Sequence, residues 1–422
     1  MKHKKTSTGI EMKILHILSQ IPEATGSGIY LQSALQHAAN RGFQNYLLAG
    51  IPADFPKHKK FQKLACRDYS AVHFEQDLPF PVVGMSDVMP YPSTRFCDLS
   101  HSDLSLYEDC FEQKLVEAVA YWQPDLIHSH HLWLLTSLTR QNFPKIPLVT
   151  SCHGSDLRQF HNCPHLQPAV LAGCREINAI CALSQEQKDE IQQLYGIEEN
   201  KIHVIGAGYD RERFYLSEQK IDPGPVQILY AGKLSHAKGV PWLLNALKKL
   251  PADKFIFHLV GDSDGAEKRE ILDLVDRLGS RVQVHGNIDQ EHLANLMRQA
   301  DLFVLPSFYE GLPLVLLEAL ACGCRVVTTA IPGVVELFSG LNSDWVELVE
   351  LPKMATIDVP QPSEDEKFID ALASALREQL ERIQRQPRIN DNPDEIQSLL
   401  DKYTWEGIFL KIERLYNRLS VK

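Results

Sequence analysis

Two glutamates, Glu310 and Glu318, stand eight residues apart on either side of a predicted strand-to-helix junction. The apolar segment 302–306 predicts a buried parallel strand, and Pro313 is typical of the first residue of a helix, which we expect to end near Gly323. One glutamate then lies at a loop tip and the other among the leucines of the helix. Burying a carboxylate there is costly unless a hydroxyl or another donor meets it. Because a sugar carries such hydroxyls, the pair predicts a carbohydrate-binding site.

A second charged group, Lys233 and Lys238, lies in a loop between a predicted strand and a helix that runs from Pro241. Ammonium groups and the free amides at a helix start attract phosphate through their charge and the helix dipole. Taken alone, the two lysines are equally well explained as solvated side chains. Combined with the two glutamates, they predict a site for a phosphate-bearing ligand.

Four histidines follow two predicted strands at the edge where open α/β sheets bind ligands. His128, His130 and His131 end one strand, and His153 ends the next. We expect His153 to contact the ligand, as either a donor-sugar or an acceptor contact. For the other three, a hydrogen-bonded structural role is slightly favoured, and His130 is retained as a candidate acceptor contact.

Short motifs beside these strands extend the predicted site. Gly26 and Gly28 follow the first strand, in a loop where backbone without a side chain can approach a ligand closely. We expect both glycines to contact the ligand; if the reaction is a group transfer, Gly28 would contact the donor and Gly26 the acceptor. Asp156 and Arg158 follow the last of the four histidines and could bind acceptor hydroxyls or a carboxylate. They could equally pair with each other on the surface.

The nine cysteines are odd in number and include no CxxC pair, which favours reduced thiols over a disulfide framework. Cys152, Cys163 and Cys174 recur every eleven residues, with His161 and His165 among them. A metal site in this segment is an alternative. Because the spacing matches no common zinc pattern, we predict no metal site.

Short apolar strands alternate with amphipathic helices along both halves of the chain, which predicts an α/β fold with two doubly wound parallel sheets. In the first half we expect strands at 12–18, 45–49, 126–129, 147–151, 179–183 and 202–205, and a helix at 30–40. In the second half we expect strands at 227–231, 254–260, 282–285, 302–305 and 325–329. The stretch 52–105 has weak periodicity and many prolines, and we assign no elements to it.

Glycines and prolines flank a polar stretch at 206–225, which predicts a linker. It separates a Rossmann-like N-terminal domain, 10–205, from a Rossmann-like C-terminal domain, 226–400, with a cleft expected between them. The tail, 401–422, has apolar residues at helical spacing and predicts a final helix from Trp405.

Length and composition limit the class of protein. A chain of 422 residues favours two domains, and hydrophobic and charged contents of 44% and 23% are typical of soluble globular proteins. The formal charge of −11 argues against a general nucleic-acid binder. The basic run 55–63 leaves weak contact with anionic lipid open, against a solvated loop. No apolar run reaches the roughly 18 residues of a membrane span and no secretory signal is evident, so we expect a cytoplasmic location.

Taken in order, these motifs resemble the retaining glycosyltransferases of family four, which have the two-domain GT-B fold and a Glu-x7-Glu motif. The likeness covers most of the chain. It is carried by Gly26-Ser27-Gly28, Asp125 to His130, His153-Gly154, Val204 to Asp210, Lys233 with Lys238-Gly239, Glu310 with Glu318, and the tail from Trp405.

The resemblance implies roles for individual residues. It gives the diphosphate to Lys233 and Lys238, the nucleotide ribose to Glu318, the donor sugar's hydroxyls to Glu310, and a sugar contact to His153. Catalysis is thereby assigned to His153, Lys238 and Glu310, and donor binding extends over Gly311, Leu312, Pro313 and Leu314. The N-terminal domain would bind the acceptor, the C-terminal domain the nucleotide sugar, and the tail helix would pack back on the N-terminal domain.

One position departs from the family, because Lys233 is often arginine there and an ammonium offers a point charge where a guanidinium offers a planar fork. The resemblance implies retention of configuration, no required cofactor or metal, and a nucleoside diphosphate sugar as co-substrate. A uridine diphosphate sugar is the first choice of donor and guanosine diphosphate mannose the second, while the acceptor is an unidentified hydroxyl. The alternatives are a sugar-nucleotide epimerase and a non-catalytic nucleotide-sugar-binding scaffold.

Overall fold

The structure is a computed structural model that describes residues 12–23, 25–55, 64–86, 89–217, 224–310, 312–341, 344–356, 358–385 and 393–420. The chain divides into two compact units, one of Met1–Gly206 with Trp405–Lys422 and the other of Ala207–Thr404. No helix in the described ranges is long and apolar enough to cross a membrane. The predicted basic run lies outside these ranges except for Phe55 and so stays a prediction.

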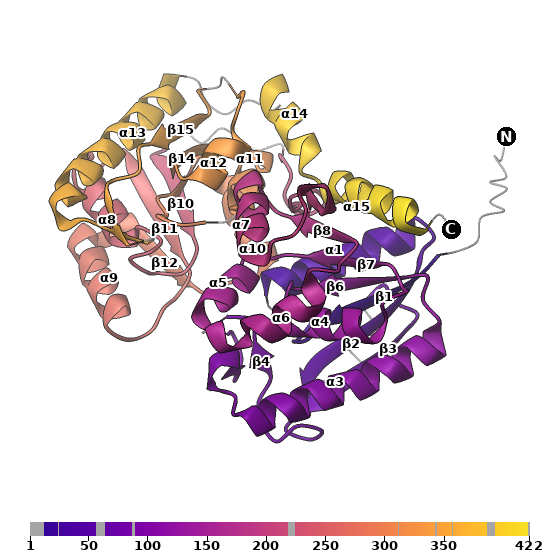
Figure 1. Cartoon of the computed structure of the whole chain (residues 1–422). Coiled ribbons are helices and arrows are strands. Elements are labelled where there is room, and N and C mark those ends of the chain that lie inside the picture. The colour runs from indigo at the N-terminus through magenta and orange to yellow at the C-terminus, as the bar shows by residue number, and fades with distance from the viewer. Residues whose placement is uncertain are drawn as a thin grey trace, which may run out of the picture. The chain divides into compact units, whose positions relative to one another are not determined.

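The N-terminal unit is built on a seven-stranded parallel sheet in the order β3-β2-β1-β6-β7-β8-β9 (Figure 1). Its strands are β1 (Lys13–Leu18), β2 (Gln44–Pro52), β3 (Asp68–Phe74), β6 (Leu126–His130), β7 (Leu148–Ser151), β8 (Ala179–Ala182) and β9 (Ile202–Val204). The strand order reverses between β1 and β6, where Leu18 lies opposite His130. Ligands of open α/β sheets bind beyond the carboxyl ends of the strands at such a reversal.

Helices cover both faces of this sheet, and the last helix of the chain belongs to it. They are α1 (Gly26–Asn40), α3 (His101–Trp122), α4 (Leu134–Asn142), α5 (Ser155–Asn162), α6 (Gln167–Cys174), α7 (Gln185–Tyr195) and α15 (Trp405–Ser420), with β4 (Val83–Gly84) and β5 (Thr94–Arg95) forming a small separate pair. Helix α15 packs against α1. The Trp405 ring lies edge-on to Tyr30 with centroids 5.1 Å apart, and the Tyr416 hydroxyl lies 2.6 Å from His128 Nδ1.

The C-terminal unit has a six-stranded parallel sheet in the order β12-β11-β10-β13-β14-β15. Its strands are β10 (Val226–Ala231), β11 (Phe255–Val260), β12 (Val282–Gly286), β13 (Leu302–Leu305), β14 (Arg325–Thr329) and β15 (Val346–Val349), and β16 (Met354–Thr356) and β17 (Val359–Pro360) form a hairpin. Its helices are α8 (Val240–Lys248), α9 (Gly265–Leu278), α10 (Gln290–Gln299), α11 (Leu314–Ala321), α12 (Pro332–Leu337), α13 (Asp365–Arg385) and α14 (Asp394–Lys402). Here the order reverses between β10 and β13. The predicted pair of doubly wound parallel sheets is confirmed.

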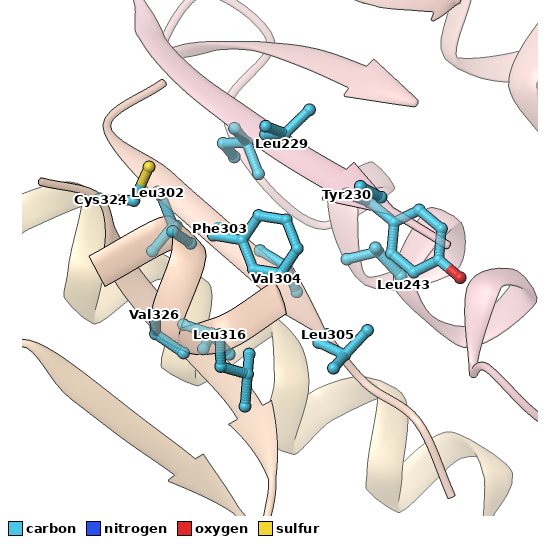
Figure 2. Packing of buried hydrophobic residues seen from close by; sticks show 14 of the residues in the cluster. Leu229, Tyr230, Leu243, Leu302, Phe303, Val304, Leu305, Leu316, Cys324 and Val326 are labelled. Carbon is cyan, nitrogen blue, oxygen red and sulfur yellow. The ribbon is translucent and has the colours of Figure 1, made fainter. Parts of the chain in front are cut away.

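The core of the C-terminal unit fixes the strands and helices that lead into its loops. Figure 2 shows Phe303 of β13 at the centre of the cluster, between β10 and α11. Both Phe303 and Leu316 of α11 are fully buried, and so is Leu243 of α8. The continuous apolar sequence of β13 is what a strand covered on both faces requires. Its burial sets where the loop after β13 begins.

Two local predictions in the N-terminal unit were wrong. Gly26 and Gly28 do not lie in a loop, because α1 begins at Gly26 and Thr25 caps it by accepting a hydrogen bond from Gly28 N–H at 3.1 Å. The cysteines are not all reduced, since Cys97 and Cys163 form a disulfide with a sequence separation of 66 residues. This bond removes Cys163 from the predicted metal alternative, and Cys152 and Cys174 are buried free thiols.

Candidate functional site

A pocket of about 410 Å³ opens at the carboxyl edge of the C-terminal sheet. It is lined by the ends of β10 and β11 and the residues after them, by the loop after β12, and by residues of α10 and α11: Ala231, Gly232, Lys233, Val260, Gly261, Asp262, Asn287, Ile288, Gln290, Leu293, Val315 and Glu318. Lys233 and Glu318, assigned to the same ligand from the sequence, therefore line one cavity. The pocket adjoins the reversal of strand order, where the fold predicts a ligand.

The loop that carries the two lysines is held by close backbone packing. Tyr230 is fully buried, and its hydroxyl donates a hydrogen bond to the carbonyl of Lys233 at 2.8 Å. Gly239 precedes α8 with a φ of +68°, and a Cβ there would lie 2.1 Å from the carbonyl oxygen of Pro306. Only glycine fits both that conformation and that approach. The start of α8, with its positive dipole end, is thus fixed beside the chain that follows β13.

Lys238 and Glu310 contact each other directly. Lys238 Nζ lies 2.5 Å from Glu310 Oε1, and the hydroxyl of Ser307 donates to the same oxygen at 2.8 Å. The sequence placed this glutamate at a loop tip but not in an ion pair. Both side chains remain partly exposed, at 27% and 17%, so a ligand can reach them.

Glu318 lies on α11 and lines the pocket. Burial raises the pKa of this carboxyl to about 7, because the charged form loses water; Arg213 opposes the shift and Asp210 adds to it. Asp210 in turn accepts hydrogen bonds from the backbone N–H groups of Glu212 and Arg213 at 3.0 and 3.3 Å. Arg213 was missed from the sequence, although it closely follows the segment from Val204 to Asp210 that carries part of the resemblance.

The remaining residues assigned to the donor lie around the start of α11. Pro313 is the residue before the helix, not its first residue, and Leu314 N–H bonds the carbonyl of Leu312 at 2.9 Å. Gly311 lies outside the described residues, so its assignment stays a prediction. Gly28 belongs to the N-terminal unit, where a Cβ would lie 2.8 Å from Glu23 N, so packing at the start of α1 requires glycine there. Its assignment to the donor stays a prediction.

In the N-terminal unit five histidines form a continuous cluster of rings. Neighbouring centroids lie 5.5 Å apart for His16 and His128, 4.5 Å for His128 and His130, 5.8 Å for His130 and His153, and 4.9 Å for His131 and His153. The sequence identified four of the five and missed His16, which sits opposite His128 in the sheet. Burial lowers the pKa of His16 and His153 to about 3 and holds the pKa values of His128 and His130 well below the ordinary range. These four rings are neutral at pH 7.

Three of these rings have nitrogens spaced closely enough to suggest a metal site: His16, His128 and His130. Their planes argue against it. His128 and His130 are stacked with an angle of 23° between them, and His16 and His130 with 26°. An imidazole binds a metal along its ring plane, so stacked rings do not converge on one ion without rotating. His128 also has both nitrogens in hydrogen bonds, to Tyr416 at 2.6 Å and to Ser151 at 2.9 Å.

Asp156 does not lie where the sequence analysis put it. It is fully buried, its Oδ1 accepts from His131 Nδ1, and its Oδ2 accepts from the backbone N–H of His153 at 2.7 Å. The alternative of a surface pair with Arg158 is wrong, because the carboxylate is buried, whereas its assignment to the acceptor stays a prediction. Arg158 is exposed, and its assignment to the acceptor stays a prediction, as do those of Gly26 and His130.

Comparisons with known proteins agree with this architecture. Residues 24–213 match the family model described as Glycosyltransferase Family 4, and residues 211–386 match the one described as Glycosyl transferases group 1. The chain belongs to the family-four glycosyltransferases and has their GT-B fold. The two matches together run from residue 24 to residue 386 and cover most of each unit.

Individual relatives are distant. A glycogen synthase of Mycobacterium tuberculosis is 30% identical over 232 residues, which cover 51% of this chain and 54% of that protein. The match thus spans about half the length of that curated relative. A sucrose-phosphate synthase from Thermosynechococcus elongatus superposes with a TM-score of 0.69 at 21% identity, over 97% of this chain and 99% of its own. The Anabaena protein HepE in complex with UDP-glucose superposes with a TM-score of 0.67 at 20% identity, over 97% and 100%.

Proposed function

We propose that this protein transfers a sugar from a nucleoside diphosphate sugar to a hydroxyl acceptor. The observation that carries the proposal is the set of four charged side chains at one edge of the C-terminal sheet. Lys233 and Glu318 line one pocket, and Lys238 pairs with Glu310 beside the start of α8. Ammonium groups and helix amides suit a diphosphate, while carboxylates suit the hydroxyls of a ribose and a hexose.

The residues present suit the departure of a diphosphate. As the bond between the anomeric carbon and the phosphate oxygen breaks, negative charge grows on the leaving group, and Lys233, Lys238 and the first amides of α8 can stabilise it. We propose that the acceptor oxygen attacks from the same face, so that configuration is retained, and that its proton passes to the departing phosphate. His153 contacts a sugar in this scheme. No other cofactor is required by it.

Uridine diphosphate sugars are the first choice of donor and guanosine diphosphate mannose the second. UDP-glucose is the ligand named for HepE, whose fold is similar. A decisive experiment incubates the purified protein with a panel of nucleotide sugars and follows release of the nucleoside diphosphate, with and without simple glycoside acceptors. We expect slow hydrolysis, or a rise in melting temperature, with one donor class.

The same panel separates the alternatives. Interconversion of the donor sugar without release of diphosphate would indicate an epimerase. A melting shift with a donor but no turnover under any condition would indicate a scaffold. No response to any nucleotide sugar would contradict the proposal. For an active donor, the anomeric configuration of the product, read by NMR, tests retention separately.

A further inference from the structure

His131 is held in an unusual backbone conformation at the end of β6. Its φ is +86°, in a region that residues other than glycine rarely adopt because it strains the backbone. Neighbours on both sides fix it there. Its N–H donates to the carbonyl of Ser151 at 2.9 Å, and its own carbonyl accepts from the hydroxyl of Thr136 at 2.6 Å. Strain that surrounding bonds maintain in this way is typical of functional sites.

The strained residue presents its ring to Asp156, in the first turn of α5. The chain reaches this turn through Gly154, whose φ is +85°. One oxygen of the carboxylate is bonded to His131 Nδ1 and the other accepts the backbone N–H of His153 at 2.7 Å. A single buried carboxylate therefore connects the residue after β6 to a residue that follows β7.

The carboxylate of Asp156 is ionised at neutral pH, because its pKa lies below the ordinary value. Burial alone would raise the pKa of Asp156, but its interaction with the His131 ring and the hydrogen bond from the backbone N–H of His153 outweigh burial and lower the pKa to about 2. An ionised carboxylate only accepts hydrogen bonds, so His131 Nδ1 must be the donor.

The ring of His153 is confined by neighbours on several sides. Tyr30 meets it edge-on at 5.0 Å, His130 stacks parallel to it at 5.8 Å, and His131 meets it edge-on at 4.9 Å. These contacts limit the ring, and the bond to Asp156 fixes the backbone from which it projects. The arrangement therefore determines both the place and the direction of one imidazole.

We propose that Asp156, oriented by His131, is a positioning residue that fixes His153 for contact with the sugar and does not itself bind the acceptor. The proposal rests on the proposed function for the role of His153 but makes a separate claim about the structure. Asp156 and His131 affect the reaction only by fixing the position and orientation of His153.

The test uses the full-length protein with the single variants Asp156→Asn, Asp156→Ala and His153→Ala, and with a double variant that combines Asp156→Asn and His153→Ala. Asp156→Asn keeps an oxygen that can accept the His153 N–H, so it serves as the conservative variant where Asp156→Ala fails to fold. His161→Ala is the matched control, because His161 lies on the same helix with its side chain 57% exposed. Circular dichroism establishes that each protein is folded.

We expect Asp156→Ala to lower kcat by about 100-fold, the loss typical of a reacting group displaced by about 1 Å. Asp156→Asn should lose less, and His161→Ala nothing. The KM for the donor should stay unchanged, because the diphosphate is bound by the other unit. Adding Asp156→Asn to His153→Ala should cause no further loss, since residues that act through one group are not additive.

Three outcomes would overturn the proposal. The same loss from Asp156→Asn with and without His153 would mean that Asp156 acts by another route. A raised KM for the acceptor with normal kcat would return Asp156 to acceptor binding. If the wild-type protein transfers no sugar, the proposed function fails, yet amide exchange at His153 still decides the positional claim. Faster exchange in Asp156→Ala, with Asp156→Asn and His161→Ala closer to wild type, supports it; unchanged exchange refutes it.

Discussion

Lys238 and Glu310 neutralise each other, with 2.5 Å between the ammonium nitrogen and Oε1. If the lysine is to bind a diphosphate and the glutamate a hexose, this pair must separate when the donor binds. Under the proposed function, the incoming phosphate would take over the ammonium and leave the carboxylate free for sugar hydroxyls. The diphosphate and the hexose would then be coupled through one ion pair.

This coupling predicts opposite effects on binding and turnover for Glu310→Gln. Removing the carboxylate charge releases Lys238, so a free nucleoside diphosphate should bind about fivefold more tightly, which corresponds to a partly exposed ion pair of roughly 1 kcal/mol. Sugar transfer should be lost, because the hexose hydroxyls lose the charged oxygen that accepts their hydrogen bonds. Calorimetric titration and a turnover assay measure the two effects.

Lys238→Ala should instead weaken nucleoside diphosphate binding and abolish transfer. The control is Lys249→Ala, which removes a lysine paired with Asp370 at 2.7 Å elsewhere in the same unit. Weaker nucleotide binding by Glu310→Gln would show that the pair does not compete with the donor. Normal turnover in either Glu310→Gln or Lys238→Ala would remove that residue from the mechanism.

Glu318 predicts a pH dependence of donor binding. Its pKa is raised to about 7, and only the ionised carboxylate can accept hydrogen bonds from both ribose hydroxyls. Affinity for a nucleotide sugar should therefore be constant above about pH 8 and fall by up to about tenfold per pH unit below about 7. A nucleotide sugar is the better probe, because its diphosphate diester does not titrate in this range. Glu318→Gln should bind weakly at every pH, and a pH dependence that persists in it would exclude this group.

The same carboxyl predicts a cost in stability. A group whose pKa rises on folding contributes its stability below the unfolded pKa, near about 4.3, and loses it as pH rises through about 7. Glu318→Gln removes that loss, so the variant should be more stable than wild type at about pH 8 by on the order of 2 kcal/mol. The difference should vanish near pH 4. Urea denaturation at the two pH values measures it, and equal stability at pH 8 would show that the carboxyl is well solvated.

Most strands could be predicted from the sequence because a parallel strand buried on both faces is a short, continuous run of apolar residues. Segment 302–306 is apolar throughout, and the structure places β13 over 302–305, fully buried. The unassigned stretch 52–105 contains β3, a strand at the sheet edge that mixes polar and apolar side chains. The long helix α3 was not predicted, although its sequence contains an N-terminal capping motif and a helical repeat of apolar residues. Ser100 and Asp103 form a capping box, and Tyr107, Phe111 and Leu115 repeat every four residues.

The candidate site was predictable where charge and local order define it. Lys233 lies after β10, and Glu318 lies in the helix after β13. Both strands end at the same edge of the sheet, so the two residues line one pocket. The role of Asp156 could not be read in this way. Its burial depends on the left-handed conformation of His131, 25 residues earlier in sequence. No local pattern indicates such a contact, just as none indicated the bond between Cys97 and Cys163.

The histidine cluster predicts that the N-terminal unit is sensitive to acid. His16, His128, His130 and His153 have lowered pKa values in the folded state, so their neutral forms are the folded ones. A base with a depressed pKa contributes stability that is present above its unfolded pKa of about 6.5 and is lost as pH falls below it. Each such ring costs up to ~1.4 kcal/mol per pH unit in that range.

The urea midpoint should therefore fall steeply between about pH 6.5 and pH 5 and change little between pH 7 and pH 8. His16→Asn should make the decline shallower, because one proton fewer is taken up on unfolding. His292→Asn is the control, since that side chain is 73% exposed in the other unit. A midpoint that does not change across the acid range would show that the cluster is solvated or already charged.

The disulfide between Cys97 and Cys163 predicts a stability that depends on reduction. It ties the segment before α3 to the end of α5, the helix whose first turn holds Asp156, across 66 residues of sequence. Closing a loop of that length restricts the unfolded chain by about 4 kcal/mol in the chain-entropy account. Thiol titration of the denatured, unreduced protein should find seven free cysteines. Reductant or Cys97→Ser should lower the melting temperature, whereas Cys66→Ser should not.

Nine titratable thiols in protein purified under oxidising conditions would show that the pair does not form. The disulfide could stabilise the fold or help to position His153, because α5 has Asp156 in its first turn and is followed directly by Cys163. Kinetics of the Cys97→Ser variant separate these two roles. If the pair forms and its loss lowers stability without changing kcat, the bond supports the fold of the N-terminal unit and has no part in positioning His153.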